Sequence, residues 1–90
     1  MRKIWKYALD VHKMTSLNLP IDARIVHFGF QGSHFIPFVW VLFRTDVVQK
    51  ELRAFDVIPT GVEVLPMHKH ISTAFSDADE VWHLFERIGF

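Results

Sequence analysis

The sequence predicts a mainly β fold: a compact antiparallel sheet of about six strands, curled as a small barrel or a sandwich, in a single domain over residues 1–90. Three observations indicate this class. Apolar and polar residues alternate with a period of two in most segments, as they do in half-buried strands. Pro, Gly, Asn and Asp separate these segments at short intervals. Half of the residues are hydrophobic and 14% are aromatic, which is enough for one core.

The first half of the chain is expected to hold three strands. The first, from Trp5 to Val11, places its aromatic and aliphatic residues on one face. Residues 13–22 contain Ser, Asn and Pro and are expected to form a connection. Residues 23–30 form the second strand, followed by a tight turn at Gln31-Gly32-Ser33. Residues 33–44 form the third strand.

That third strand is apolar on both faces, with Phe35 and Val39 alternating with Ile36, Phe38 and Trp40. Both faces therefore need cover, from a closed barrel, a second sheet, a helix or another subunit.

The second half of the chain is expected to hold three more strands. The last of them, residues 81–86, has an alternative as a short amphipathic helix over 80–88, because Val81, Leu84 and Ile88 have helical spacing. We favour the strand because β-branched and aromatic residues are frequent in this short segment. The remaining segments are a connection over 45–50, a strand over 52–58 ended by Pro59-Thr60-Gly61, a loop or short strand over 62–67, a strand over 70–75 and a turn over 76–79.

Five local patterns follow one another along most of the chain. They are Trp5-Lys6-Tyr7-Ala8-Leu9; Leu19-Pro20 with Ala23-Arg24-Ile25-Val26; Val39-Trp40-Val41-Leu42; Arg53-Ala54-Phe55-Asp56-Val57-Ile58 leading into Thr60-Gly61; and Val81-Trp82-His83-Leu84-Phe85-Glu86. In this order they resemble a family of small bacteriophage and prophage proteins of unknown function. Pro59 and Ser72 stand where that family tends to have Gly, and Val62 where it has His. The resemblance implies a compact β-rich fold and a viral origin, but no activity.

No constellation of catalytic residues is recognisable, so we expect a protein that is not an enzyme, with no catalytic residues and no cofactor. None of the candidate hydroxyl residues lies in a nucleophile motif such as GxSxG. The four glycines are scattered and do not build a phosphate-binding loop. The chain has no cysteine, which excludes a disulfide framework and a thiol nucleophile. The hydroxyl candidates considered are Ser33, Thr60, Ser72 and Thr73.

Histidine is frequent, with six residues in 90. His68 and His70 lie on one face if their segment is a strand, and two such imidazoles are the beginning of a metal site. A third ligand would have to be His83, His27 or a carboxylate such as Asp79. No spacing typical of zinc sites is present, so we expect no metal and interpret these residues as ordinary strand or surface histidines.

The charge is balanced overall, with ten Lys and Arg against ten Asp and Glu. Residues 1–30 nevertheless carry five basic and two acidic side chains, and residues 61–90 carry two basic and five acidic ones. Either the two ends of the chain lie near each other and compensate, or the molecule has a basic face that meets an anion.

Aromatic and basic residues are available for the second interpretation. Trp5, Trp40 and Trp82 are able to stack on bases, and Lys3, Lys6, Arg24 and Arg53 to contact phosphates. Core packing of the tryptophans is the interpretation we favour, because it is their ordinary role in a small domain.

Arg53 has two interpretations, of which a small-ligand site is the more specific. This residue shares a strand face with Phe55 and Val57, so its ordinary role would be a salt bridge to a nearby carboxylate. The alternative is contact with an anion beside the Thr60-Gly61 turn, whose amides would help to bind it. The candidate ligand-binding residues are Arg53, Thr60, Gly61, His70, Trp82 and His83.

Three functions compete. The leading hypothesis is a small non-enzymatic binding protein, encoded by a phage or prophage, that acts by contact with a host macromolecule such as a defence component. Neutral charge and excess apolar residues suit a protein partner. The alternatives are a binder that sequesters an anionic, nucleotide-like small ligand, and a minor structural or assembly protein.

The expected partners and location follow from these features. We expect a host protein as partner and self-association to a dimer, because the strand that includes Phe35–Phe43 is apolar on both sides. Nucleic acid and membrane are not expected partners. The basic start is not followed by an apolar segment of signal-peptide length, and nine apolar residues fall short of the roughly 20 that a spanning helix needs. We therefore expect the protein in the cytoplasm of the infected bacterial host.

Overall fold

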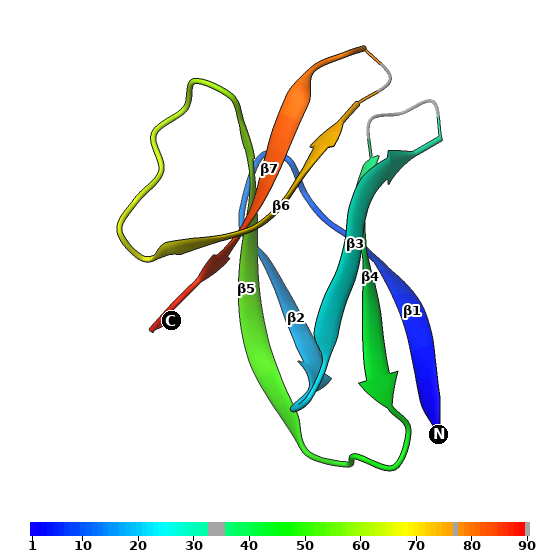
Figure 1. Ribbon diagram of the computed structural model, residues 1–90. Coiled ribbons are helices and arrows are strands. Elements are labelled where there is room, and N and C mark those ends of the chain that lie inside the picture. The colour runs from blue at the N-terminus through cyan, green and yellow to red at the C-terminus, as the bar shows by residue number, and fades with distance from the viewer. Residues whose placement is uncertain (33–35, 77, 90) are drawn as a thin grey trace.

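Two antiparallel sheets form the molecule, which is a sandwich without closure into a barrel (Figure 1). The computed structural model describes residues 1–32, 36–76 and 78–89. The three-stranded sheet has the order β1-β4-β3, and the four-stranded sheet has the order β2-β5-β7-β6. The strands are β1 (Arg2–Ala8), β2 (Thr15–Pro20), β3 (Arg24–Gln31), β4 (Ile36–Arg44), β5 (Lys50–Pro59), β6 (His68–Phe75) and β7 (Val81–Arg87).

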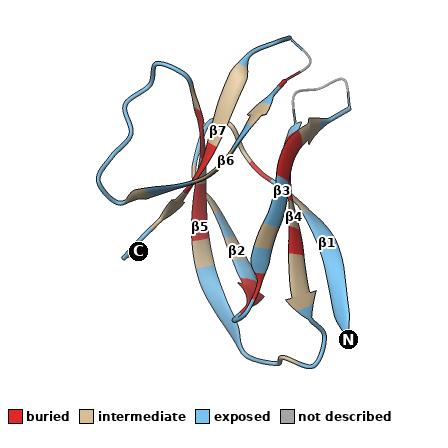
Figure 2. Ribbon diagram, viewed as in Figure 1, coloured by how far each residue is buried: buried red, intermediate tan, exposed pale blue. Residues whose placement is uncertain are grey.

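The core lies between the two sheets, where alternate residues of the central strands meet (Figure 2). Phe28 and Val39 are opposite each other in the β3–β4 pair, and Val41 follows on the same face of β4. Phe55 and Leu84 come from β5 and β7. These five side chains are at most 2% exposed. Burial of a large apolar side chain contributes about 1.5–3 kcal/mol, so this set is the main source of stability.

Most of the expected strands are confirmed. Strands β3, β5, β6 and β7 begin and end within two residues of the predicted ranges, and β4 coincides with residues 36–44 of its range. The segment 81–87 is a strand and not a helix, because Trp82 and Leu84 face the core while His83 and Phe85 lie on the opposite face. Residues 62–67 form a loop without a strand. Parts of the predicted third strand and turns lie outside the described residues, among them Ser33, Phe35 and Asp77.

Two expectations about the first twenty residues are wrong. The first strand ends at Ala8, so Leu9 and Val11 lie in the following turn. There Asp10 accepts a hydrogen bond from the His12 amide at 2.7 Å and donates its own N–H to Thr15 at 3.0 Å. The supposed connection over 13–22 contains β2, so the described residues hold seven strands where about six were expected.

The first strand ends before Val11 because the chain changes sheets there. The turn after β1 carries the chain from the three-stranded sheet to the edge of the four-stranded sheet, where β2 pairs with β5. Leu19 from β2 then enters the core with no exposed surface.

The described residues include no helix long and apolar enough to cross a membrane.

Candidate binding surfaces

The six residues expected to bind a ligand are divided between the two faces of the four-stranded sheet. Strand β7 alternates, so Trp82 and Glu86 point toward the three-stranded sheet and His83 points away from it. Arg53 shares the inner face with buried Phe55. Thr60, Gly61, His70 and His83 gather on the outer face, at the end where β5 leaves the sheet. The predicted site therefore does not converge as one constellation.

A chain of hydrogen bonds joins three of the outer-face residues. Thr73 Oγ1 lies 2.9 Å from both His70 Nε2 and His83 Nδ1, and His83 Nε2 lies 2.9 Å from Thr60 Oγ1. Thr60 Oγ1 donates to the Val81 carbonyl at 3.3 Å. Because each hydroxyl has one proton, His83 must donate from Nε2 to Thr60 and accept at Nδ1 from Thr73, which in turn accepts from His70. This chain fixes the orientation of both imidazoles.

A shallow pocket of about 240 Å³ lies beside this chain. Thr60, Gly61 and His83 line its polar part, and Gly61 adopts φ 96°, a left-handed conformation that favours glycine. Its apolar part is formed by Ile58, Pro59, Val62, Val64 and Phe85. The arrangement offers one hydroxyl and one imidazole to a small molecule.

Arg53 has the ordinary role considered for it, a salt bridge. Its Nε and Nη2 donate to the two carboxylate oxygens of Glu86 at 2.7 and 2.8 Å, and its Nη1 donates to the Ala23 carbonyl at 2.8 Å. The hydrogen bond from Arg53 to Glu86 raises the pKa of the guanidinium, although burial opposes this. These bonds connect β5 to β7 and to the start of β3.

Trp82 also has an interior role. It packs against the core and lies 6.1 Å from the ring of Phe30, between centroids. Its Nε1 atom is buried and has no hydrogen-bond partner among the described residues. Trp82 is therefore a packing residue and does not stand beside His83 in a ligand site.

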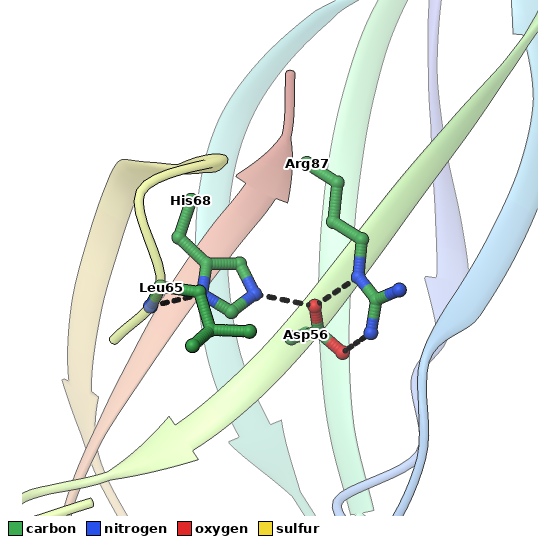
Figure 3. Close-up of polar contacts among 4 residues, drawn as sticks. All are labelled: Asp56, Leu65, His68 and Arg87. Carbon is green, nitrogen blue, oxygen red and sulfur yellow. Dashed lines mark hydrogen bonds and ion pairs between the residues drawn. The ribbon is translucent and has the colours of Figure 1, made fainter. Parts of the chain in front are cut away.

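A polar cluster that the sequence did not reveal holds the 60–67 loop against the four-stranded sheet (Figure 3). His68 Nδ1 accepts the Leu65 amide at 3.0 Å, and its Nε2 therefore carries the proton donated to Asp56 at 2.8 Å. Arg87 donates Nε and Nη2 to the same carboxylate at 2.7 and 3.2 Å. Burial raises the pKa of Asp56, but the hydrogen bonds from Arg87 and His68 outweigh it and the pKa lies below its usual value.

This cluster has a structural role. The His68 side chain is only 5% exposed, and both of its ring nitrogens have protein partners. That arrangement leaves neither nitrogen for a metal, and His70 faces Thr73 instead. Within residues 1–32, 36–76 and 78–89 there is no group of three or more His, Asp or Glu side chains able to hold a metal ion.

The outer face of the three-stranded sheet combines apolar and aromatic side chains with cations, and no other part of the described chain covers it. We call it the platform and define it by Ile4, Lys6, His27, Phe38 and Trp40, with Arg2, Arg24, Val26, Gln31, Ile36, Leu42 and Arg44 around them. Register places these residues, except Val26 at the irregularity between Ile25 and His27, on the side opposite to buried Val39 and Val41. Ile4 is 57% exposed, while Phe38 and Trp40 are half-buried among their neighbours.

The rings of the platform contact one another and a cation. The centroids of His27 and Trp40 are 5.0 Å apart, and those of Phe38 and Trp40 are 6.2 Å apart. Lys6 Nζ lies 4.6 Å from the Phe38 centroid and donates to Gln31 Oε1 at 2.7 Å. An ammonium over an aromatic face is attracted by the ring quadrupole, so Lys6 is held in place over the sheet.

An open groove of about 390 Å³ runs along the β1 side of the platform. Its lining consists of Ile4, Trp5, Lys6, Gln31 and Trp40. Trp5 is 56% exposed because β1 is the end strand of its sheet, and every residue of β1 except Tyr7 is exposed (Figure 2). Register pairs Trp5 with Val41, so its side chain points to the core side of the sheet and not over the platform. The groove therefore offers the Trp40 indole, the Lys6 ammonium and the Gln31 carboxamide, which are groups suited to a flat anionic ligand.

No curated protein and no solved structure matches the chain at a significant level. The model of a protein family matches residues 1–89, in agreement with the resemblance to a family of unknown function that the local patterns carry. Because this match spans nearly the whole chain, the protein belongs to the family described as "Domain of unknown function (DUF7352)".

Proposed function

We propose that this protein is a small non-enzymatic binding module that acts by contact between the platform and a macromolecule. On the phage or prophage origin that the sequence resemblance implies, that macromolecule belongs to the bacterial host, for example to its defence machinery. The observation that carries the proposal is the uncovered apolar and aromatic outer face of β1, β4 and β3. Aromatic residues on an exposed sheet face are typical anchors of an interface.

The contrast between the two outer faces supports this choice. The outer face of the four-stranded sheet is partly covered by the 60–67 loop, which is held by His68 and Asp56. The platform has no such strap among the described residues, although β4 is apolar on this side as well as on the core side. Apolar strand residues left uncovered by their own chain are typical of contact surfaces.

A capture experiment with a matched pair of variants tests the proposal. Ile4 lies on the platform and Leu52 on β5 of the other sheet, and both are 57% exposed. We expect Ile4→Glu to abolish capture of the host macromolecule that the wild-type protein retains at near-physiological salt, and Leu52→Glu to retain it. Captured protein is identified by mass spectrometry and captured nucleic acid by nuclease sensitivity. The proposal is wrong if wild-type protein captures nothing, or if Ile4→Glu captures as much as Leu52→Glu.

A second candidate function uses the pocket beside Thr60 and His83. Its volume of about 240 Å³ and its convergent hydroxyl and imidazole suit sequestration of a small, nucleotide-like ligand. The test is a thermal shift against a panel of nucleotides. A ligand at 100 times its Kd stabilises the folded state by about 2.7 kcal/mol, which a melting curve detects. A panel without any shift removes this candidate.

A further inference from the structure

We infer that the platform binds single-stranded nucleic acid, with a base stacked on Trp40 in the groove and the phosphates along the cations of β1, β3 and β4. This inference rests on the proposed function and names the class of macromolecule. It depends on the distribution of charge between the two sheets, on the groups that line the groove, and on the length of the basic surface.

The distribution of charge is the first step. The neutral whole-chain charge, on which the expectation against nucleic acid was based, hides a strong separation. Strands β1, β3 and β4 contain five Lys and Arg and no Asp or Glu. The remainder of the chain therefore holds five basic and ten acidic residues. When all charged side chains in the strands of a sheet are positive, the sheet attracts a polyanion even if the molecule as a whole is neutral.

The cations differ in availability. Arg44 is paired with Asp46 at 2.8 Å, and Asp22 lines a shallow depression together with Arg2 and Arg24. No carboxylate among the described residues forms an ion pair with Arg2, Lys3, Lys6 or Arg24. Register places Arg2, Lys6 and Arg24 on the platform side of the sheet. These three cations are the phosphate contacts that we assign.

The lining of the groove is the second step. Trp40, Lys6 and Gln31 line it from the platform side of the sheet. An indole face stacks on any nucleobase, an ammonium contacts phosphate, and a carboxamide hydrogen-bonds base edges. An acidic peptide would satisfy Lys6 but would leave the Trp40 indole without a flat partner, so stacking separates nucleic acid from a merely acidic chain.

The extent of the surface is the third step. Arg2 and Lys6 are four residues apart on one strand, which separates them by about 13 Å. Arg24 extends the basic surface across the sheet to β3. A free mononucleotide would reach only the groove end of this surface, whereas a strand would follow it. A second copy of this chain docked face to face would instead bring like charges together, which is destabilising.

Fluorescence anisotropy with a labelled 20-nucleotide oligo-dT, and with oligo-U of the same length, tests the inference. We expect binding at low salt, with a slope of log affinity against log salt of about −2, because three phosphate contacts on a single strand each contribute about −0.7. An abasic oligomer of the same length is expected to bind at least about 10-fold more weakly, because it removes the bases that stack.

Matched variants locate the site. Lys6→Gln is expected to lower affinity several-fold and to reduce the salt slope by about 0.7, whereas Lys69→Gln, an exposed cation on β6, changes neither. Trp40→Ala is expected to weaken binding about 5- to 100-fold, and Trp40→Phe to keep most of it. Phe75→Ala, at 68% exposure on the other sheet, is the control for loss of an aromatic side chain. Thermal unfolding of each variant separates a lost contact from lost folding.

Each contrary outcome points to a distinct failure. Absence of oligonucleotide binding at low salt overturns the inference, while the capture experiment with Ile4→Glu decides independently whether the platform binds anything. Equal affinity for polyglutamate and oligo-dT assigns an acidic protein segment instead. Complete displacement of the oligomer by a mononucleotide at an equal nucleotide concentration assigns a free nucleotide. Equal losses from Lys6→Gln and Lys69→Gln place the contact outside the platform.

Discussion

Arg53 is a residue whose contribution to stability can be measured directly. Its side chain is 16% exposed, and its guanidinium donates to both carboxylate oxygens of Glu86 and to the Ala23 carbonyl. Removing one partner leaves a partly buried charge without its hydrogen bonds, so we expect Arg53→Met to lower the free energy of unfolding by about 1.5–3 kcal/mol. Urea denaturation measures the change.

Arg44 provides the control for that prediction. It also forms an ion pair, with Asp46 at 2.8 Å, but both side chains are more than half exposed. Water and salt screen such a pair, so Arg44→Met is expected to leave the free energy of unfolding nearly unchanged. A cost for Arg53→Met that does not exceed the cost for Arg44→Met would contradict the structural role assigned to Arg53.

Asp56 makes stability depend on pH. Burial favours its neutral form, but the hydrogen bonds from Arg87 and His68 hold its pKa below the unfolded value of about 3.9. The folded state therefore binds fewer protons, and the stabilisation is present above the unfolded pKa and lost as pH falls through the folded one. We expect Asp56→Asn to lower stability at pH 7 by about 1–3 kcal/mol and to flatten its decline below about pH 5.

Urea titrations at intervals from pH 7 to pH 3 check this prediction. Asp46→Asn is the control, because the pKa of Asp46 is also lowered, by Arg44, but at an exposed site where screening weakens the effect. If the free energy of unfolding falls in parallel for wild type and Asp56→Asn below pH 5, the polar cluster is not the source of its dependence on pH.

Single residues also show why the polar cluster was missed. Asp56 and His68 are twelve positions apart, and Arg87 lies nineteen beyond His68. Nothing in the alternation of β5, β6 or β7 specifies which residues of these strands become neighbours, because strand order and register decide it. The sequence singles out His68 only through its spacing from His70, and that spacing says nothing of Asp56 or Arg87.

At the scale of elements, β2 tests whether a segment with turn-like composition contributes to the core. Leu19 is fully buried, whereas Leu52 on neighbouring β5 is 57% exposed. We expect Leu19→Ala to destabilise the protein by about 2–5 kcal/mol, because it removes buried methyl groups and leaves a cavity. Leu52→Ala is expected to change stability by no more than about 0.5 kcal/mol. Equal effects, measured by urea denaturation, would mean that β2 does not pack as described.

The same strand shows what composition hides. Thr15–Pro20 alternates Leu17 and Leu19 with Ser16 and Asn18, as a half-buried strand does. Asn18 and Pro20 are typical of turns and outweighed that alternation in the prediction. Pro20 is tolerated because β2 is the end strand of its sheet, where one edge has no partner strand. The central strands had no such conflict, and their alternation was sufficient to predict them.

At the scale of the molecule, the sequence predicted the fold class but not the assignment of strands to sheets. Alternation shows which residues of one strand share a face, but not which face of β4 meets the other sheet. The two-sided apolar character of this strand predicts that both faces need cover, from a closed barrel, a second sheet, a helix or another subunit. Separation of the cations onto one sheet was equally hidden, because it arises from sheet order: β1, β3 and β4 pair while the acidic segments lie elsewhere.

Self-association remains expected, and the structure gives a reason to locate it at the free edge of β1. Leu9 donates its amide to Pro37 on β4, and Met1 accepts from Thr45 beyond it. Odd-numbered residues of β1 therefore direct their backbone groups to β4, and even-numbered residues direct theirs to the free edge. A second copy is able to pair there antiparallel without using the charged platform.

Charge restricts the register of such a pairing. Centred on Ile4, two copies would set Arg2 opposite Lys6, and like charges directly opposite each other are destabilising. Centred on Trp5, the even residues still meet in hydrogen-bonding positions, but Lys6 faces Ile4 and Arg2 faces Ala8. In other registers the lysines oppose pairing of a second strand at this edge. In the register centred on Trp5 they allow one symmetric dimer.

A proline at position 4 distinguishes this dimer from other modes of association. Ile4→Pro removes an edge-directed amide without removing a bond to β4, so we expect a monomer near 10.6 kDa by light scattering at high micromolar concentration. Wild type and Ile4→Thr, which keeps the amide and reduces the apolar surface, are expected at twice that mass. Circular dichroism confirms that each variant is folded. A wild-type mass near 10.6 kDa refutes self-association, and a dimeric Ile4→Pro places the interface elsewhere.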